Sequence, residues 1–296
     1  MNILFDNVNT NSSSGPNSFG KRLITEMKKS GHNVGVDISN PDVQLSFITT
    51  QKKLANLALR LDGIYFNVHQ DWGQLNAPIR KSYDLADLVV YQSEFNQKLT
   101  ETFFGPAKKS VVINNGTCLE TISNIKPLSN PILNNFSEVW SCASSWRPHK
   151  RLKDNINYFL ENAPSDACMV VAGENFDFNA QNPRIFYAGH LPWEQCISLY
   201  KRSKVFVHLA FLDHCPNVVV DARASGCKLV VASSGGTKEI SGLDSTIIKD
   251  LDWDMKPLDL YSPPPLDYSQ KINNNFDRNI DITTVARRYI NFLEAI

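Results

Sequence analysis

The chain alternates short apolar runs with amphipathic, helix-like segments, and the alternation runs through the sequence twice. The runs are continuous in their apolar character, which is typical of parallel strands covered on both faces. Strand–helix–strand repeats favour parallel sheets wound on both sides by helices. We therefore expect an α/β protein with two Rossmann-like, doubly wound sheets. The runs expected to form strands are residues 2–8, 33–39, 43–49, 57–68, 86–93 and 110–116, then 138–145, 167–173, 184–190, 204–211 and 228–234. The run 57–68 is expected to break near Asp62 and Gly63.

The two series meet near residues 118–136, and this meeting point divides the chain. We expect an N-terminal domain over residues 1–128 and a C-terminal domain over residues 129–274. A last helical pattern, at about residues 275–296, is expected to return and complete the first domain. Open parallel sheets bind ligands beyond the carboxyl ends of their strands, so two facing sheets would line a shared cleft.

The overall composition argues against several classes of function. The 296 residues hold 30 Lys and Arg against 30 Asp and Glu, so a net charge of zero gives no reason to expect nucleic acid as a partner. No window approaches about 18 consecutive apolar residues, so no transmembrane segment is expected, although peripheral membrane contact stays open. Six cysteines without a C-x-x-C pair indicate neither a zinc site nor a disulfide framework. The expectation is a reduced, soluble, cytoplasmic protein.

Two aspartates eight positions apart, Asp213 and Asp221, follow one of the later strands. Between them Pro216 suits the first turn of a helix, where its missing N–H costs nothing. That helix start, with Asn217 and Val218, offers free N–H groups and a positive dipole end to a phosphate. Asp213 could accept hydrogen bonds from sugar hydroxyls, and Asp221 could take both hydroxyls of a ribose. The alternative, in which Asp213 caps the helix and Asp221 is solvated, is about equally supported by the spacing.

Four cations fall within the stretch 147–153, just after a strand: Arg147, Lys150, Arg151 and Lys153. Such a loop can clamp a diphosphate and stabilise the charge on a departing phosphate, although a solvated basic loop is the more common case. Gly15, in the loop after the first strand, permits close approach of the backbone to a ligand. No G-x-G-x-x-G fingerprint follows any strand, which disfavours an oxidoreductase.

In the first half of the chain, three residues that follow strands could act as a base or steady a positive charge: Asp62, His69 and Asp71. The competing interpretation of His69 is a satisfied or simply exposed histidine. The other histidines do not form a spaced metal-binding set, so no metal is expected.

Taken together, four segments in this order resemble motifs of the family-4-like, retaining GT-B glycosyltransferases. The first is a glycine loop followed by a helix and a strand start, and the second is a strand with its following turn. The third is a lysine-containing loop, and the fourth is a donor-site motif with two acids eight apart. They read "SGPNSFGKRLITEMKKSGHNV", "ADLVVYQSEFNQKL" with "VVINNGT", "RPHKRLKD" and "DHCPNVVVDARASGCKLVVASSGGTKEI".

The resemblance implies a hexosyltransferase type of enzyme. A nucleotide-sugar donor would be held by the second domain and a glycan or other hydroxyl acceptor by the first. The resemblance also implies no cofactor and no metal, because the basic loop would bind the diphosphate. By position, its site residues are Lys150 and Arg147 for the diphosphate, Asp221 for the ribose, Asp213 for the donor sugar, Gly189, His190 and Leu191 for the base, and Gly15 and Pro16 for the phosphates.

The chain also departs from the family pattern at several positions. Both acids are Asp where the family usually has Glu, and Arg151 and Lys228 replace a usual Gly and Pro. The usual Arg before the loop lysine is Ser145, for which Arg147 can substitute. The family's cleft histidine falls on Asp62, with His69 as a nearby alternative. The Asp replacements leave open a catalytically weak nucleotide-sugar-binding protein. A second alternative is a GT-B sugar-nucleotide epimerase, although the donor-site motif favours a transferase.

Overall fold

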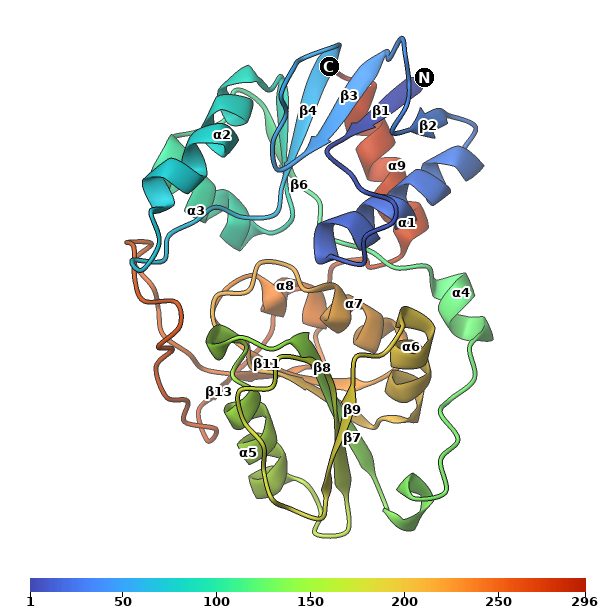
Figure 1. Cartoon of the computed structure of the whole chain (residues 1–296), viewed down its shortest axis with the longest axis vertical. Helices are drawn as coiled ribbons and strands as arrows, with labels where there is room; N and C mark the ends of the chain where they lie inside the picture. The colour runs from blue at the N-terminus through green and yellow to red at the C-terminus, as the bar shows by residue number, and fades with distance from the viewer.

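The computed structural model describes residues 1–296 and contains two open sheets that face each other end to end (Figure 1). The first sheet is wholly parallel, in the order β2-β1-β3-β4-β5-β6. The second has the order β13-β12-β11-β10-β7-β8-β9 and is parallel except for β13. The α/β class and the GT-B arrangement expected from the sequence are therefore confirmed.

Both sheets are built from the apolar runs of the sequence. The strands of the first sheet are β1 (Asn2–Asp6), β2 (Asn33–Gly35), β3 (Val43–Phe47), β4 (Asn56–Leu61), β5 (Leu88–Tyr91) and β6 (Ser110–Val112). Those of the second sheet are β7 (Val139–Ser145), β8 (Cys168–Glu174), β9 (Ile185–Gly189), β10 (Val205–His208), β11 (Lys228–Ala232), β12 (Thr246–Ile248) and β13 (Lys271–Ile272).

Helices α1 (Gly15–Lys29) and α9 (Ile282–Leu293) pack side by side on one face of the first sheet (Figure 1). Phe19, Leu23 and Met27 lie on one side of α1 at four-residue spacing and are fully buried. Tyr289 of α9 contacts Phe19 with ring centroids 6.1 Å apart. The last helix of the chain thus lies in the core of the first domain.

On the other face of the first sheet, helices cover only the half that contains β4 and β5. Helices α2 (Trp72–Leu85) and α3 (Glu94–Phe104) bury the far faces of β4 and β5. No helix occurs in the crossovers over residues 36–42 and 48–55. The face of β1 and β3 away from α1 therefore carries a polar network, in which Gln44 and Ser46 donate to one Asp6 oxygen at 2.9 and 2.8 Å.

The second sheet is covered on both faces. Helix α5 (Leu152–Asn162) packs on one face. The helices on the other face are α6 (Trp193–Arg202), α7 (Asn217–Ala224) and α8 (Thr237–Ser241), with the linking helix α4 (Leu119–Asn124) beside them. None of the helices in either domain is both long and apolar enough to cross a bilayer.

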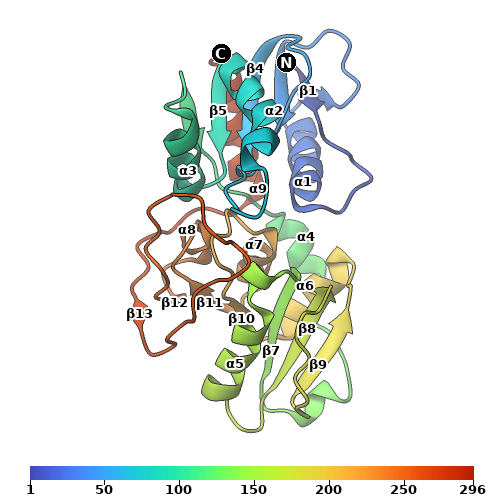
Figure 2. The ribbon, with the colours of Figure 1, turned by 60° about the vertical axis from the view of Figure 1, so that its left-hand side comes forward.

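After β12 the chain runs back to the first domain, and we call residues 251–262 the strap (Figure 2). The backbone of Leu258 exchanges hydrogen bonds with Val68 and Phe66, at 3.0 and 3.2 Å. Trp253 packs against Phe66 with ring centroids 4.6 Å apart. The sequence predicts only a connecting segment here, whereas in the structure the strap joins the two domains.

The apolar run over residues 57–68 is broken near Asp62 and Gly63, as the sequence predicts. Strand β4 ends at Leu61, and Gly63 turns the backbone with a φ of 138° that residues with a side chain rarely adopt. Helix α2 was not expected, since Gly73 and Pro78 interrupt its pattern. Its start is nevertheless fixed by Asp71, whose side chain accepts from the Gln74 N–H at 3.0 Å.

Candidate active site between the two domains

A cavity of about 330 Å³ lies between the carboxyl ends of the two sheets. The first domain contributes Asp62 and residues 63–67 to its wall. The second contributes Arg147, His149, Asp213 and His214, and the strap adds Leu260 and Tyr261. Three residues proposed from the sequence to act in donor binding or catalysis, Asp62, Arg147 and Asp213, therefore line one space.

Asp213 sits in the loop between β10 and α7 and faces two basic side chains. Its Oδ2 is 2.5 Å from Lys150 Nζ and 3.0 Å from His208 Nε2. Burial alone would raise the pKa of Asp213, but Lys150 and His208 hold it well below its usual range. The Asp213 carboxylate is thus kept ionised inside the cavity wall.

The basic loop after β7 divides into two parts. Arg147 is exposed at the cavity and Lys150 pairs with Asp213, so both face the site. Arg151 instead adopts a left-handed backbone with φ 54° and buries its guanidinium against Asp250, at 2.7 Å. The left-handed backbone explains why glycine is usual at this position in the family the chain resembles. Lys153 lies near the Phe178 ring, at 5.8 Å, outside the cavity.

Two histidines of the cavity wall are held neutral. Burial lowers the pKa of His149 to about 3, and Lys150 adds to the effect. Burial likewise lowers the pKa of His214 to about 4. The His214 ring packs so closely on Gly63 that a Cβ there would come within 2.4 Å of it. The turn after β4 and the loop before α7 therefore fit together only with glycine at this position.

Asp62 projects into the cavity from the end of β4 and is fixed by a buried cation. Arg60, two residues earlier, is fully buried between the Phe19 and Phe47 rings and donates to Asp62 Oδ1. The second oxygen, Oδ2, has no hydrogen-bond partner. Asp62 thus lines the cavity with one carboxylate oxygen bonded to Arg60 and the other buried without a partner.

His69 and Asp71, the other first-domain candidates, lie outside this cavity. His69 is exposed over 65% of its side chain and faces Asp259 of the strap, at 3.2 Å. Asp71 is the N-cap of α2. Only Asp62 of the three is therefore placed beside Asp213.

The start of α7 meets the glycine loop of the first domain. Pro216 is the N-cap residue, and the amides of Asn217 and Val218 occupy the first turn. The Asn217 side chain donates to the Gly15 carbonyl at 2.9 Å, next to Pro16. The start of α7 and the glycine loop thus lie side by side, and the free N–H groups of the helix start could bind a phosphate there.

Asp221, expected to bind a ribose, is buried and already bonded. Arg22 of α1 donates to both of its oxygens, at 2.9 and 2.7 Å, and Trp193 Nε1 donates to Oδ2 at 2.9 Å. The Arg22 guanidinium also lies over the Trp193 ring, 5.3 Å from its centroid. The expectation of a solvated Asp221 is wrong, and a ribose would have to displace at least one of these donors.

Sequence reasoning missed Arg22 and Trp193, because nothing distinguishes Arg22 from the other cations of α1 before the domains are packed. Gly189 ends β9, and His190 and Leu191 lead towards α6, whose first residue is Trp193. His190 is exposed, and Gly189 has open space around its Cα. No group of three or more His, Cys, Asp or Glu residues is placed to hold a metal ion.

Comparisons with known proteins agree with this geometry. Residues 147–255 match the family model described as "Glycosyl transferases group 1". The structure is similar to Anabaena Alr3699/HepE in complex with UDP-glucose, with TM-score 0.67 and 16% identity over all of both chains. AviGT4, a glycosyltransferase involved in avilamycin A biosynthesis, aligns with TM-score 0.65 and 11% identity over 99% of this chain and 97% of that one. No curated protein matches in sequence.

A sucrose-phosphate synthase from Thermosynechococcus elongatus also aligns, with TM-score 0.64 and 12% identity over 84% of this chain and 86% of that one. At these identities the likenesses establish the fold, and the fold is GT-B.

Proposed function

We propose that this chain, which carries a glycosyl transferases group 1 domain over residues 147–255, transfers a sugar from a nucleotide-diphosphate sugar to a hydroxyl acceptor with retention of configuration. One observation carries the proposal. The cavity between the domains brings Asp62, Arg147 and Asp213 together, with Lys150 bound to Asp213. Cations for a diphosphate and carboxylates for a sugar thus occupy one space.

The donor diphosphate would lie at the start of α7, where Arg147, Lys150 and the first-turn amides can bind its oxygens. Lys150 would then exchange Asp213 for a phosphate. The released Asp213 carboxylate would accept hydrogen bonds from hydroxyls of the donor sugar. In the absence of donor, the Lys150–Asp213 ion pair therefore takes the place of two contacts, that of Lys150 with a phosphate and that of Asp213 with the sugar.

In the transfer step, the bond between the anomeric carbon and the phosphate oxygen breaks as the acceptor oxygen bonds to the same carbon. The acceptor proton passes to the leaving phosphate oxygen on the same face, which gives retention. Arg147 and Lys150 stabilise the negative charge that develops on the leaving group. Asp62, which lines the cavity, stabilises the positive charge near the anomeric carbon.

HepE, which aligns over the whole chain, is seen with UDP-glucose, so a UDP-sugar is the first donor to test. We further propose that the base is bound by residues 189–191 and that catalysis needs no metal, because the basic loop supplies the positive charge. Cytoplasmic location stays a prediction.

The test is release of free nucleotide diphosphate from UDP-, GDP- and ADP-sugars, with and without EDTA, and NMR assignment of the product anomer. We expect release with at least one donor in both conditions. Asp213→Ala should lower kcat by about 100-fold, as loss of a group acting at the reacting sugar does. Asp221→Ala should mainly weaken nucleotide binding, measured by calorimetry.

The matched control is Asp177→Ala, which removes an exposed carboxylate outside the cavity and should leave both quantities unchanged. Nucleotide binding without release from any donor would identify a binding protein instead. Interconversion of donor sugars without an acceptor would identify an epimerase. An inverted product anomer would contradict retention.

A further inference from the structure

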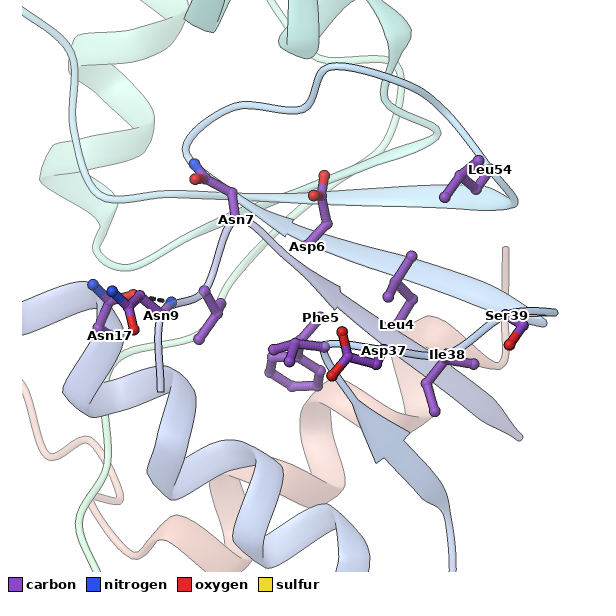
Figure 3. Close-up of a pocket in the computed structure, with 12 residues that line it drawn as sticks. Leu4, Phe5, Asp6, Asn7, Asn9, Asn17, Asp37, Ile38, Ser39 and Leu54 are labelled. Atoms are coloured by element: carbon purple, nitrogen blue, oxygen red, sulfur yellow. Dashed lines mark hydrogen bonds between the residues drawn. The ribbon is translucent and has the colours of Figure 1, made fainter. Parts of the chain in front are cut away.

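A second and larger cavity, of about 720 Å³, lies on the first domain and shares no residue with the cavity between the domains. It runs along β1 from Leu4 to Asn9 (Figure 3). Its other walls are Asn17 of α1, residues 36–39 after β2, and Leu54. We call it the β1 groove.

The β1 groove exists because two crossovers lack helices. Residues 36–42 and 48–55 connect parallel strands directly, so no helix covers the face of β1 away from α1. The chain places β2 on one side of β1 and β3 on the other, which makes the carboxyl end of β1 the switch point of this sheet. Ligands of open α/β sheets bind in the crevice at such a point.

The polar lining suits neutral hydroxyl groups. Asp6 uses only Oδ2 within the protein, for Gln44 and Ser46, so its Oδ1 is left for a ligand. Asp37 is exposed on the opposite wall (Figure 3). Amides and a hydroxyl complete the lining, from Asn7, Asn9, Asn17 and Ser39. No Lys or Arg lines the groove, so two carboxylates without a cation would repel an anionic ligand.

The apolar part of the lining is at the rim. Val36 and Leu54 expose 36% and 52% of their surface there, and Ile38 follows Asp37 in the same segment of the wall. Sugars present apolar C–H faces as well as hydroxyls, and ligand sites commonly combine an apolar surface with a few placed polar groups. This mixture fits a carbohydrate better than a lipid chain or a phosphate.

The β1 groove ends at the glycine loop of the candidate active site. The Asn9 N–H donates to Asn17 Oδ1 at 2.8 Å, and Asn17 Nδ2 donates to Ser14 Oγ at 2.9 Å. The next residue, Gly15, accepts from Asn217 at the start of α7. Strand β1 is separated from β4, which carries Asp62 at its end, only by β3. Two strand spacings amount to about 10 Å.

We propose that the β1 groove binds the non-reacting residues of a neutral oligosaccharide acceptor, whose terminal sugar reaches the cavity between the domains. This inference rests on the proposed function and narrows its acceptor. It excludes acidic glycans and requires an acceptor longer than a monosaccharide.

The test uses Asp37→Lys, a change at an exposed residue that introduces a cation into the groove wall. The probes are neutral malto-, cello- and chito-oligosaccharides, from disaccharide to hexasaccharide, with oligogalacturonides as acidic counterparts. We expect the wild-type protein to bind a neutral glycan, with affinity that increases with length. In Asp37→Lys the dissociation constant should rise at least about fivefold, as for one lost hydrogen bond. Hydrolysis of the nucleotide-sugar donor should not change.

Asp244→Lys, at an exposed aspartate of the second domain, is the matched control and should leave glycan affinity unchanged. Failure of every neutral glycan to bind, preference for oligogalacturonides, or an equal loss in both variants would overturn the inference. Donor hydrolysis reports separately on the proposed function. If hydrolysis persists while the glycan result is negative, only the acceptor inference fails.

Discussion

At the scale of single residues, Asp221 is the position where sequence and structure differ most informatively. The family resemblance implies a ribose ligand for it, yet its oxygens are taken by Arg22 and Trp193. Arg22 comes from the other domain, 199 residues earlier in the chain. The nucleotide would therefore compete with an internal cation for this carboxylate.

Removing that competitor should strengthen nucleotide binding. In Arg22→Met, Asp221 keeps only the Trp193 donor, and we expect the dissociation constant for UDP to fall roughly tenfold, since a hydrogen bond to a charged group is worth about 1.5–3 kcal/mol. Calorimetry with UDP measures this directly. Lys21→Met removes the neighbouring exposed cation of α1 and should have no effect. Weaker UDP binding in Arg22→Met would show that Arg22 is itself a nucleotide ligand.

The sequence predicts which residues lie together when they follow strands of the same sheet. It does not predict contacts that form only when the two domains pack. Arg147, Lys150 and Asp213 follow strands of one sheet, so the rule for carboxyl ends brings them together. Arg22 and Tyr261 reach their sites only when distant segments meet. No periodic pattern in the sequence indicates contacts between such distant segments.

At the scale of elements, the strap is the segment that most alters the site. It supplies Leu260 and Tyr261 to the cavity between the domains. Tyr261 stacks on His149, with ring centroids 5.8 Å apart. Its anchor is Trp253, which packs on Phe66 and donates from Nε1 to the Lys256 carbonyl at 2.8 Å.

Removal of this anchor should affect both stability and transfer. Trp253→Ala deletes a half-buried ring, and we expect the free energy of unfolding in urea to fall by about 2 kcal/mol, below the range for fully buried tryptophans. Transfer to an acceptor should fall more than donor hydrolysis, because the strap forms the wall beside Asp62. Lys256→Ala, an exposed change in the same segment, should alter neither, since surface pairs contribute little. Equal losses of transfer and hydrolysis would contradict this role.

The alternation of apolar runs predicted most strands and the helices between them, because each element repeats a local pattern. The misses also have local causes. Helix α2 contains Gly73 and Pro78, which lower its apparent helix propensity. The strap has no pattern of its own, since its contacts belong to Phe66 and Val68 of the other domain. The sequence therefore indicates a connecting segment but does not predict that this segment packs against the first domain.

At the scale of the whole molecule, the two domains are held together by buried polar contacts. The Glu239 carboxylate, from the second domain, accepts from the N–H groups of Glu94 and Phe95 at 2.8 and 3.0 Å, at the start of α3. Burial raises the pKa of Glu239. Asn217 and Asp221 of the second domain also contact the first domain. The interface is therefore sensitive to protonation.

The neutral histidines of the cavity predict how stability depends on pH. His149 and His214 have pKa values of about 3 and 4, whereas an unfolded histidine titrates near 6.5. Below pH 6.5 the unfolded chain binds more protons, so stability falls as pH decreases towards 4, by at most about 1.4 kcal/mol per pH unit for each histidine. The raised pKa of Glu239 acts in the opposite direction, but through one group only.

Urea unfolding at a series of pH values between about 7 and 5 measures this slope. In His149→Gln the slope should be smaller than in the wild-type protein. His190→Gln, which changes an exposed histidine, is the control and should keep the wild-type slope. Stability that does not change over this range would show that the buried histidines are protonated in the folded state.

The position of α9 has a consequence for how the chain matures during synthesis. Phe19 and the apolar side of α1 are covered partly by Tyr289, which is synthesised after the whole second domain. The domain in the middle of the sequence can close while the polypeptide is still being translated. The first domain stays incomplete until α9 has been synthesised, and until then the apolar side of α1 is exposed to binding by a chaperone.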